Sequence, residues 1–283
     1  MLADWKFYII SYLFISVVFN NSYKIITNNM RNAGAMTILI QFLSSIICLI
    51  MIPLFEFKLS SDYKVYLFLF LSIIFYTLND RLGTTARRGL EASTYIILKQ
   101  LSTVFMIFSG IFIFKESFVL NRFMGALIII FSNILVFYKK GKFIFNKYLI
   151  FGILANISLS IALFLDVNYS NKFNLSFYIL LTFLIPAILI FIFERIKISN
   201  IILEYKNSNK LILFITSISW TLMMITKLKS YQLGNVVMVA TISSLTVILN
   251  VIISYFFLKE KDKLIKKIIA SILIIIGIIL IKI

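Results

Sequence analysis

The sequence contains no histidine and a single cysteine, Cys48, and both facts limit its chemistry. Without a second cysteine, no disulfide can form within the chain. The absence of histidine removes the commonest proton relay near neutral pH and the commonest metal ligand. Any proton coupling is therefore left to carboxylates, and we predict no metal site and no bound cofactor.

The sequence also lacks the short motifs of soluble enzymes. It contains no glycine-rich phosphate-binding loop, no nucleophile elbow and no metal-ligand cluster. The links between its apolar segments are short, so no soluble domain fits between them. We therefore predict that the protein is not an enzyme.

Apolar residues are abundant instead. They make up 61% of the chain, against roughly 45–50% in typical soluble domains. They gather in ten segments, each near the roughly 20 residues that an α-helix needs to span a bilayer. The segments cover residues 6–26, 33–55, 64–84, 91–114, 121–138, 147–168, 174–194, 210–231, 236–258 and 263–283. The predicted fold class is an all-α membrane protein with ten transmembrane helices, a multi-pass protein of the cell (plasma or inner) membrane.

The net charge of +17 comes from 28 lysines and arginines against 11 carboxylates. Most of these charges lie at the ends of the apolar segments, where anionic lipid headgroups are their natural partners. We therefore expect contact with membrane lipid and no binding of nucleic acid. We expect a monomer or a homodimer.

The two halves of the chain repeat one pattern. When the second half is moved back by 144 positions, Lys259–Glu260 falls on Lys115–Glu116, a charged corner between two apolar segments. Internal repeats of this kind indicate duplicated structural units. We predict two five-helix units, residues 1–139 and 147–283.

Lys99 lies near the middle of the fourth apolar segment. A charge at the bilayer centre costs at least about 2.5–3.5 kcal/mol, so it needs water, a carboxylate or an anionic ligand nearby. Tyr95, Lys99 and Ser102 share one helix face with Met106 and Ser109. The equivalent positions of the ninth segment include Ser243, Thr246 and Asn250. Two polar faces on related helices predict a shared central cavity.

Other residues are candidates for the cavity wall, among them Trp220, which lies deep in the eighth segment. Packing against a neighbouring helix is an open alternative for Asn20 and for the hydroxyl residues. The predicted substrate-binding residues are Lys99, Tyr95, Ser102, Gln100, Asn20, Tyr76, Trp220, Ser243, Thr246 and Asn250.

Three carboxylates could pair with Lys99 or couple transport to protons: Asp80, Glu91 and Asp166. A solvated position at a segment end is the alternative for Asp166. Arginines crowd the stretch between Asp80 and Glu91. We interpret this stretch as an interfacial loop, because arginines commonly extend from helix ends towards the membrane surface. An anion-attracting mouth of the cavity is the alternative.

Five helices, a basic linker and five related helices, with a Lys-Glu corner in each half, resemble the drug/metabolite transporter superfamily and its EamA-like branch. The small residues of Gly125–Ile128 and Ala270–Leu273 are similar to the family's start of its fifth and tenth helices. The resemblance covers the whole chain by architecture. It implies a secondary transporter with two inverted five-helix repeats around a central site.

The fourth helix departs from the common pattern, which has a proline near Leu101–Ser102. Leu98–Leu101 is instead similar to the nucleotide-sugar and phosphate-ester branches, where a lysine meets the anionic substrate. The expected function is alternating-access transport of a small polar, anionic organic metabolite. Export of amino acids or amphipathic drugs is an alternative, as is a non-transporting subunit of a cell-surface polysaccharide system.

The orientation in the membrane stays open at this point. The resemblance implies that both chain termini lie in the cytoplasm. With that orientation, about twice as many basic residues of the connecting segments lie outside as inside. The positive-inside rule thus favours the opposite orientation.

Overall fold

The computed structural model describes residues 4–102, 104–105, 119–139, 142–143, 146–234, 239 and 242–281. Within them the regular secondary structure is helical apart from the short antiparallel strands β1 (Tyr138–Lys139) and β2 (Lys142–Phe143). The α-helices are α1 (Trp5–Asn28), α2 (Ala33–Met51), α3 (Tyr63–Gly89), α4 (Ala92–Lys99), α6 (Leu120–Phe137), α7 (Lys147–Tyr169), α8 (Leu175–Phe193), α9 (Ile198–Asn207), α10 (Lys210–Leu233), α12 (Thr246–Phe257) and α13 (Leu264–Leu280). Two 3-10 turns, η1 (Ile52–Leu54) and η2 (Ser170–Lys172), follow α2 and α7.

By length and composition, seven described helices can cross a membrane. They cover Trp5–Asn28, Ala33–Leu54, Tyr63–Gly89, Leu120–Phe137, Lys147–Lys172, Leu175–Phe193 and Lys210–Leu233. Large apolar side chains such as Phe14, Ile50 and Phe193 are more than 60% exposed, as expected for surfaces that face lipid. The prediction of an all-α, multi-pass membrane protein is confirmed.

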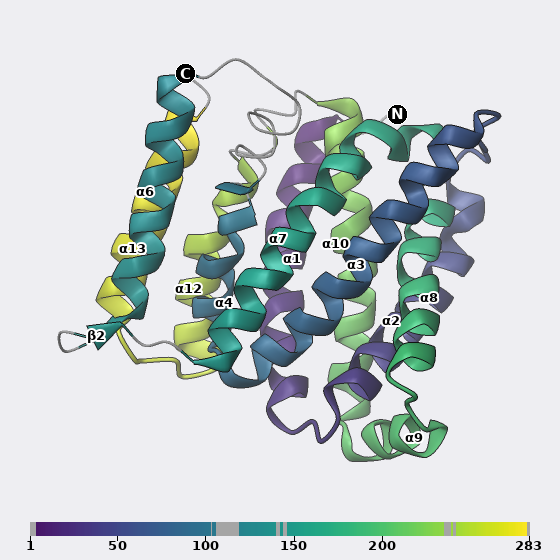
Figure 1. Ribbon diagram of the computed structural model, residues 1–283, viewed down its shortest axis with the longest axis horizontal. Helices are drawn as coiled ribbons and strands as arrows, with labels where there is room; N and C mark the ends of the chain where they lie inside the picture. Colours follow the sequence, from purple (N-terminus) through teal and green to yellow (C-terminus); the bar gives the residue numbers. More distant parts are fainter. Residues whose placement is uncertain are drawn as a thin grey trace.

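The helices form two groups that lie side by side (Figure 1). α1, α2, α3, α7, α8 and α10 enclose the larger apolar core, in which Tyr178, Phe183 and Ile40 are almost fully buried. α4, α6, α12 and α13 enclose a second core around Ile129 and Ile274. The pair α6–α13 forms one edge of the molecule, whereas α4 and α12 form the side of the second group that packs against the first.

Asparagine side chains mark where four of the helices begin. Asn32, Asn146, Asn174 and Asn209 each accept a hydrogen bond from the backbone N–H three residues later, at 2.9 to 3.2 Å. An N-cap of this kind satisfies a backbone donor that the helix itself leaves unpaired. The local sequence therefore determines these helix starts.

The helix α3 ends later than the predicted 84, and the expected interfacial loop is helical up to Gly89. Lys24 stabilises this extension, because its Nζ donates to the carbonyl of Arg87 at 2.7 Å and to that of Arg88 at 3.4 Å. A cation at a helix C-terminus satisfies free carbonyls and complements the helix dipole. Interpreting this stretch as a loop was therefore wrong.

The connection between the predicted segments 174–194 and 210–231 is not a plain loop, because its middle forms the helix α9. Ile201 packs against the apolar core, while Ile198 and Ile202 are exposed. Glu204 is buried and accepts hydrogen bonds from the backbone N–H groups of Arg31 and Asn32 at 2.9 and 2.6 Å. The helix is thus held at the N-terminus of α2 by a carboxylate, a favourable place for negative charge. The Lys115–Glu116 corner, which the repeat of the two halves predicts, lies outside the described residues.

Candidate functional site

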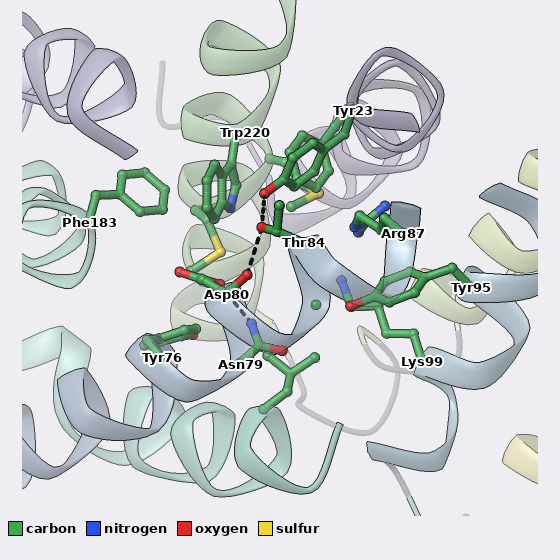
Figure 2. A pocket seen from close by; sticks show the side chains of 15 residues that line it. Tyr23, Tyr76, Asn79, Asp80, Thr84, Arg87, Tyr95, Lys99, Phe183 and Trp220 are labelled. Carbon is green, nitrogen blue, oxygen red and sulfur yellow. Dashed lines mark hydrogen bonds between the residues drawn. The ribbon is translucent and has the colours of Figure 1, made fainter. Parts of the chain in front are cut away.

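A cavity of about 50 Å³ lies among six helices, three from each half of the chain (Figure 2). One buried water needs roughly 10–15 Å³, so the cavity holds a few waters or a small solute. It is lined by Phe19 and Tyr23 of α1, by Tyr76, Asn79, Asp80, Gly83, Thr84 and Arg87 of α3, by Tyr95 and Lys99 of α4, and by Leu159, Phe183, Trp220, Met223 and Met224 of α7, α8 and α10.

Arg87 lies on the last turn of α3, and aromatic rings enclose its guanidinium group. The guanidinium carbon is 4.0 Å from the ring centroid of Tyr95, 4.8 Å from that of Tyr23 and 5.4 Å from that of Phe19. Its Nη2 donates to Asn20 Oδ1 at 3.1 Å. Cation–π contacts in a desolvated site contribute about 2 kcal/mol, so the rings stabilise this cation without neutralising it.

The other terminal nitrogen of Arg87, Nη1, is buried and has no hydrogen-bond partner among the described residues. Arg87 as a whole is only 4% exposed. A buried donor without a partner costs about 1–3 kcal/mol, and more for a charged group. Since Arg87 lines the cavity, an anion bound there can accept from Nη1.

Lys99 is half-buried and also lines the cavity, at the C-terminal end of α4. Within the part of the chain that the structure describes, its ammonium group forms no ion pair with Asp80, Glu91 or Asp166. The charges that act on it are the cations Lys227 and Arg87 and the carboxylate Asp80. Arg87 and Lys99 therefore line one cavity, and neither forms an ion pair with a described carboxylate.

Asp80 is buried on α3, two helical turns before Arg87, and also lines the cavity. Its oxygens accept hydrogen bonds from Gln41 Nε2 at 2.8 Å and from Asn79 Nδ2 at 2.7 Å. The next turn carries Thr84, which accepts from Tyr23 or donates to it at 2.6 Å. This polar strip along α3 places one negative charge on the same helix face as Arg87.

Asp166 lies inside the protein at the end of α7 and is fully buried, which excludes the solvated loop position considered for it. Its Oδ1 accepts from Ser72 at 2.9 Å and from Tyr178 at 2.6 Å, and its Oδ2 accepts from Tyr76. The ring of Tyr76 lines the cavity. One tyrosine thus separates this carboxylate from the candidate site.

Glu91 is bound away from the cavity, because it forms an ion pair with the buried Lys267 of α13. Next to it, Glu260 closes the start of α4. The carboxylate of Glu260 accepts from the backbone N–H groups of Ala92 at 2.6 Å and Ser93 at 3.1 Å, and from the Ser93 hydroxyl. The Glu260 corner therefore joins the α12–α13 connection to the N-terminus of α4.

Among the predicted site residues, Tyr76, Asp80, Tyr95, Lys99 and Trp220 line the cavity. Asn20 lies behind it and holds Arg87. Gln100, Ser102, Ser243, Thr246 and Asn250 are not among the lining residues. Three of these bond to their own helix backbone, since Ser102 donates to Lys99 O, Thr246 to Ser243 O and Asn250 to Thr246 O.

Arg87, Thr84 and Phe183 also line the cavity, although they were not predicted as site residues. Phe183 lies 4.8 Å from Trp220, and the Phe19 ring stacks on Trp220 at 5.5 Å, measured between ring centroids. Figure 2 shows Phe183 and Trp220 across the cavity from Arg87. With 29 phenylalanines in the chain, no sequence signal distinguished this one. For Arg87 the sequence did contain a signal. Arg87 follows Asp80 by seven residues, and this spacing places both side chains on one face of a helix.

Comparison with known proteins relates the second half of the chain to a transporter family. The model of the EamA-like transporter family matches residues 146–283. No curated protein matches the chain. A solved structure, described only as the crystal structure of a protein, has the same fold with a TM-score of 0.63 and 11% identity, over 95% of this chain and 96% of that one. The resemblance to the EamA-like transporters of the drug/metabolite transporter superfamily is therefore confirmed: the second half of the chain matches the family model, and this match indicates a multi-pass membrane transporter of that type.

Proposed function

We propose that the protein is a secondary transporter that moves a small organic anion across the cell membrane by alternating access. The observation that carries this proposal is the pairing of Arg87 and Lys99 in one cavity, with neither cation bound to a described carboxylate. Buried cations normally have a counter-charge, and here an anionic substrate would supply it. The aromatic rings of Tyr76, Tyr95 and Trp220 would contact the substrate body.

The fold behind this proposal is a ten-helix arrangement of two inverted repeats, residues 1–139 and 147–283. The helix packing supports it. Counted along the predicted segments, the first packs on the eighth and the third on the sixth, as α1–α10 and α3–α7. The second packs on the seventh, the fourth on the ninth and the fifth on the tenth. Exchanging the two halves leaves this set of pairs unchanged, as a two-fold repeat requires.

The place of the cavity fits the mechanism of repeat transporters. In such proteins the substrate site lies between the repeats near the bilayer midplane, and one bundle rocks against the other around it. Here three helices of each half line the cavity. Its small volume, about 50 Å³, suits a closed state that opens to admit a larger solute.

A zwitterion is a second candidate substrate, and Asp80 is the observation that favours it. Asp80 lines the same cavity on the same face of α3 as Arg87. A solute with one ammonium and one carboxylate group would place an opposite charge beside each of them. The anion and the zwitterion differ in their dependence on Asp80, which makes them separable by experiment.

Binding can be measured through Trp220, because Trp5 is the only other tryptophan in the chain. The variant Trp5→Phe leaves Trp220 as the sole tryptophan, and a solute in the cavity should quench or shift its fluorescence. Pyruvate, glycerol 3-phosphate, alanine and glycerol provide three-carbon probes that carry a carboxylate, a phosphate, both charges or none. We expect saturable signals with the anions and none with glycerol.

Variants of the two cations complete the test. Arg87→Gln and Lys99→Gln should each weaken the response to the anions at least tenfold, while Arg88→Gln, an exposed neighbour, should not. Saturable binding of alanine that Asp80→Asn abolishes would favour the zwitterion. Equal responses to all four probes, or anion binding untouched in both cation variants, would contradict an anion site.

A further inference from the structure

Exposed basic side chains gather at one end of the molecule, the end that carries α9 and β2 and lies opposite the chain termini in Figure 1. They belong to the connections between α1 and α2, α8 and α10, and α12 and α13, to the last turn of α3 and to the start of α7. They are Arg31, Arg88, Lys147, Arg195, Lys197, Lys206, Lys210, Lys259 and Lys261.

The described carboxylates of this end are fewer than its exposed cations, and most of them are already bound. Asp262 is exposed in the α12–α13 connection. Glu204 and Glu260 are buried on the helix N-termini of α2 and α4. Glu91 is paired with the buried Lys267, and Glu194 with Arg81 at 2.5 Å. The end therefore presents an excess of positive charge to its surroundings.

The opposite end is different. Among the described residues, the exposed basic side chains of this end are fewer, and exposed carboxylates accompany them. The basic residues are Lys6, Lys58, Lys64, Arg122 and Lys172, and the carboxylates are Asp4, Glu56 and Asp62. The charge difference between the two ends is therefore a property of the folded surface and not only of the loop sequences.

The helix α9 adds an apolar component to the basic end. Its exposed Ile198, Ile202 and Tyr205 are spaced to share one face, and Lys197 and Lys206 lie at its two ends. An amphipathic helix with apolar residues on one face and flanking lysines is typical of a helix that lies in the headgroup region of a membrane.

We propose that this basic end, with α9 in the headgroup region, lies against the anionic lipids of the cytoplasmic leaflet. Asp4 and Ile281 would then lie on the opposite side of the membrane. Anionic headgroups attract lysine and arginine clusters next to transmembrane helices, and cytoplasmic connections carry the excess of these residues. This orientation is the reverse of the one that the family resemblance implies.

Single cysteines test the orientation directly. In a Cys48→Ala background, Asn207→Cys places a thiol at the basic end and Ser61→Cys places one at the other end; both positions are exposed. We expect a membrane-impermeant maleimide to label Ser61→Cys in intact cells and Asn207→Cys only after permeabilisation. The reverse pattern, or equal labelling of both in intact cells, would overturn the proposal. If a variant fails to accumulate, Ser199→Cys and Asn171→Cys replace the pair.

A second arm tests whether the basic charge is the cause. Changing Arg31, Lys197, Lys206 and Lys261 to Gln should raise labelling of Asn207→Cys in intact cells several-fold. The matched variant changes Lys6, Lys58, Lys64 and Lys172 at the other end, and it should leave labelling as it was. Equal effects of the two variants would contradict a role for the charged surface. Neither arm depends on the substrate, so the orientation can fail while the transport proposal stands.

Discussion

The guanidinium carbon of Arg87 lies 4.0 Å from the centre of the Tyr95 ring, so the end of α3 and the helix α4 form one wall of the cavity. Stacking uses the flat face of the guanidinium and leaves its edge for hydrogen bonds. Asn20 accepts from Nη2, whereas Nη1 has no partner among the described residues and stays available to a ligand.

We predict that Arg87→Lys binds anionic probes almost as poorly as Arg87→Gln. An ammonium keeps the charge, but it cannot stack on the Tyr95 ring and donate to Asn20 and to a ligand at once. The fluorescence of Trp220 in the Trp5→Phe background measures the affinity. Near-normal affinity in Arg87→Lys would indicate that charge alone is recognised.

Two buried glutamates should respond differently to amide substitution. Both N–H donors on Glu204 reach the same oxygen, Oε1, which a glutamine keeps. Glu204→Gln should therefore lose only the charge effect at a helix N-terminus, about 0.3–1 kcal/mol. Glu260 uses both oxygens, so Glu260→Gln turns an NH₂ group towards a backbone donor.

We expect Glu260→Gln to cost about 1–3 kcal/mol, because one buried N–H loses its partner. Thermal unfolding of the purified protein should therefore rank Glu260→Gln below Glu204→Gln in midpoint temperature. The exposed neighbour Lys261→Ala serves as the control and should behave like the unmodified protein. Equal midpoints for both glutamine variants would show that the Glu260 contacts do not stabilise the fold.

Two glycines allow close contact between α6 and α13. A Cβ atom on Gly125 would meet the carbonyl oxygen of Gly277 at 2.4 Å, and one on Gly277 would meet that of Gly125 at 2.8 Å. Small residues permit such backbone contact between membrane helices. Gly125→Ala and Gly277→Ala should each destabilise the protein by about 1–3 kcal/mol through overpacking, with Gly125→Ala the worse. Ile272→Ala, on the exposed face of α13, should change the unfolding midpoint little.

Tyr76 and Tyr178 both donate to Asp166, but they should contribute differently to the stability of the fold. Among the described residues, Tyr76 is the only donor on Oδ2, whereas Tyr178 shares Oδ1 with Ser72. Tyr76→Phe leaves one carboxylate oxygen without a described donor and should cost about 1–3 kcal/mol. Tyr178→Phe should cost less, because Ser72 still donates. Unfolding midpoints give the order, and a reversed order would place the main support of Asp166 on Tyr178.

Much of this molecule could be predicted from local sequence. The apolar segments predicted the helical membrane class, and the 3.6-residue period placed Tyr95 and Lys99 on one face of a helix that lines the cavity. The depth of Trp220 in its segment also agreed with its place in the cavity. The charged corner at Lys259–Glu260 marked the end of α12, although its contact with α4 was not foreseen.

Arg87 shows what the sequence alone could not decide. In the sequence it stands near a segment end, where an arginine normally extends to the membrane surface. Only the folded protein brings Lys24 to the end of α3, which lengthens that helix, and only then do Tyr23 of α1 and Tyr95 of α4 enclose the guanidinium. Conversely, Thr246 and Asn250 have a polar pattern in the sequence but bond to their own helix. Residue type and spacing determine which face of a helix is polar, whereas the packing of distant helices decides which polar groups keep a free hydrogen-bonding atom for a ligand.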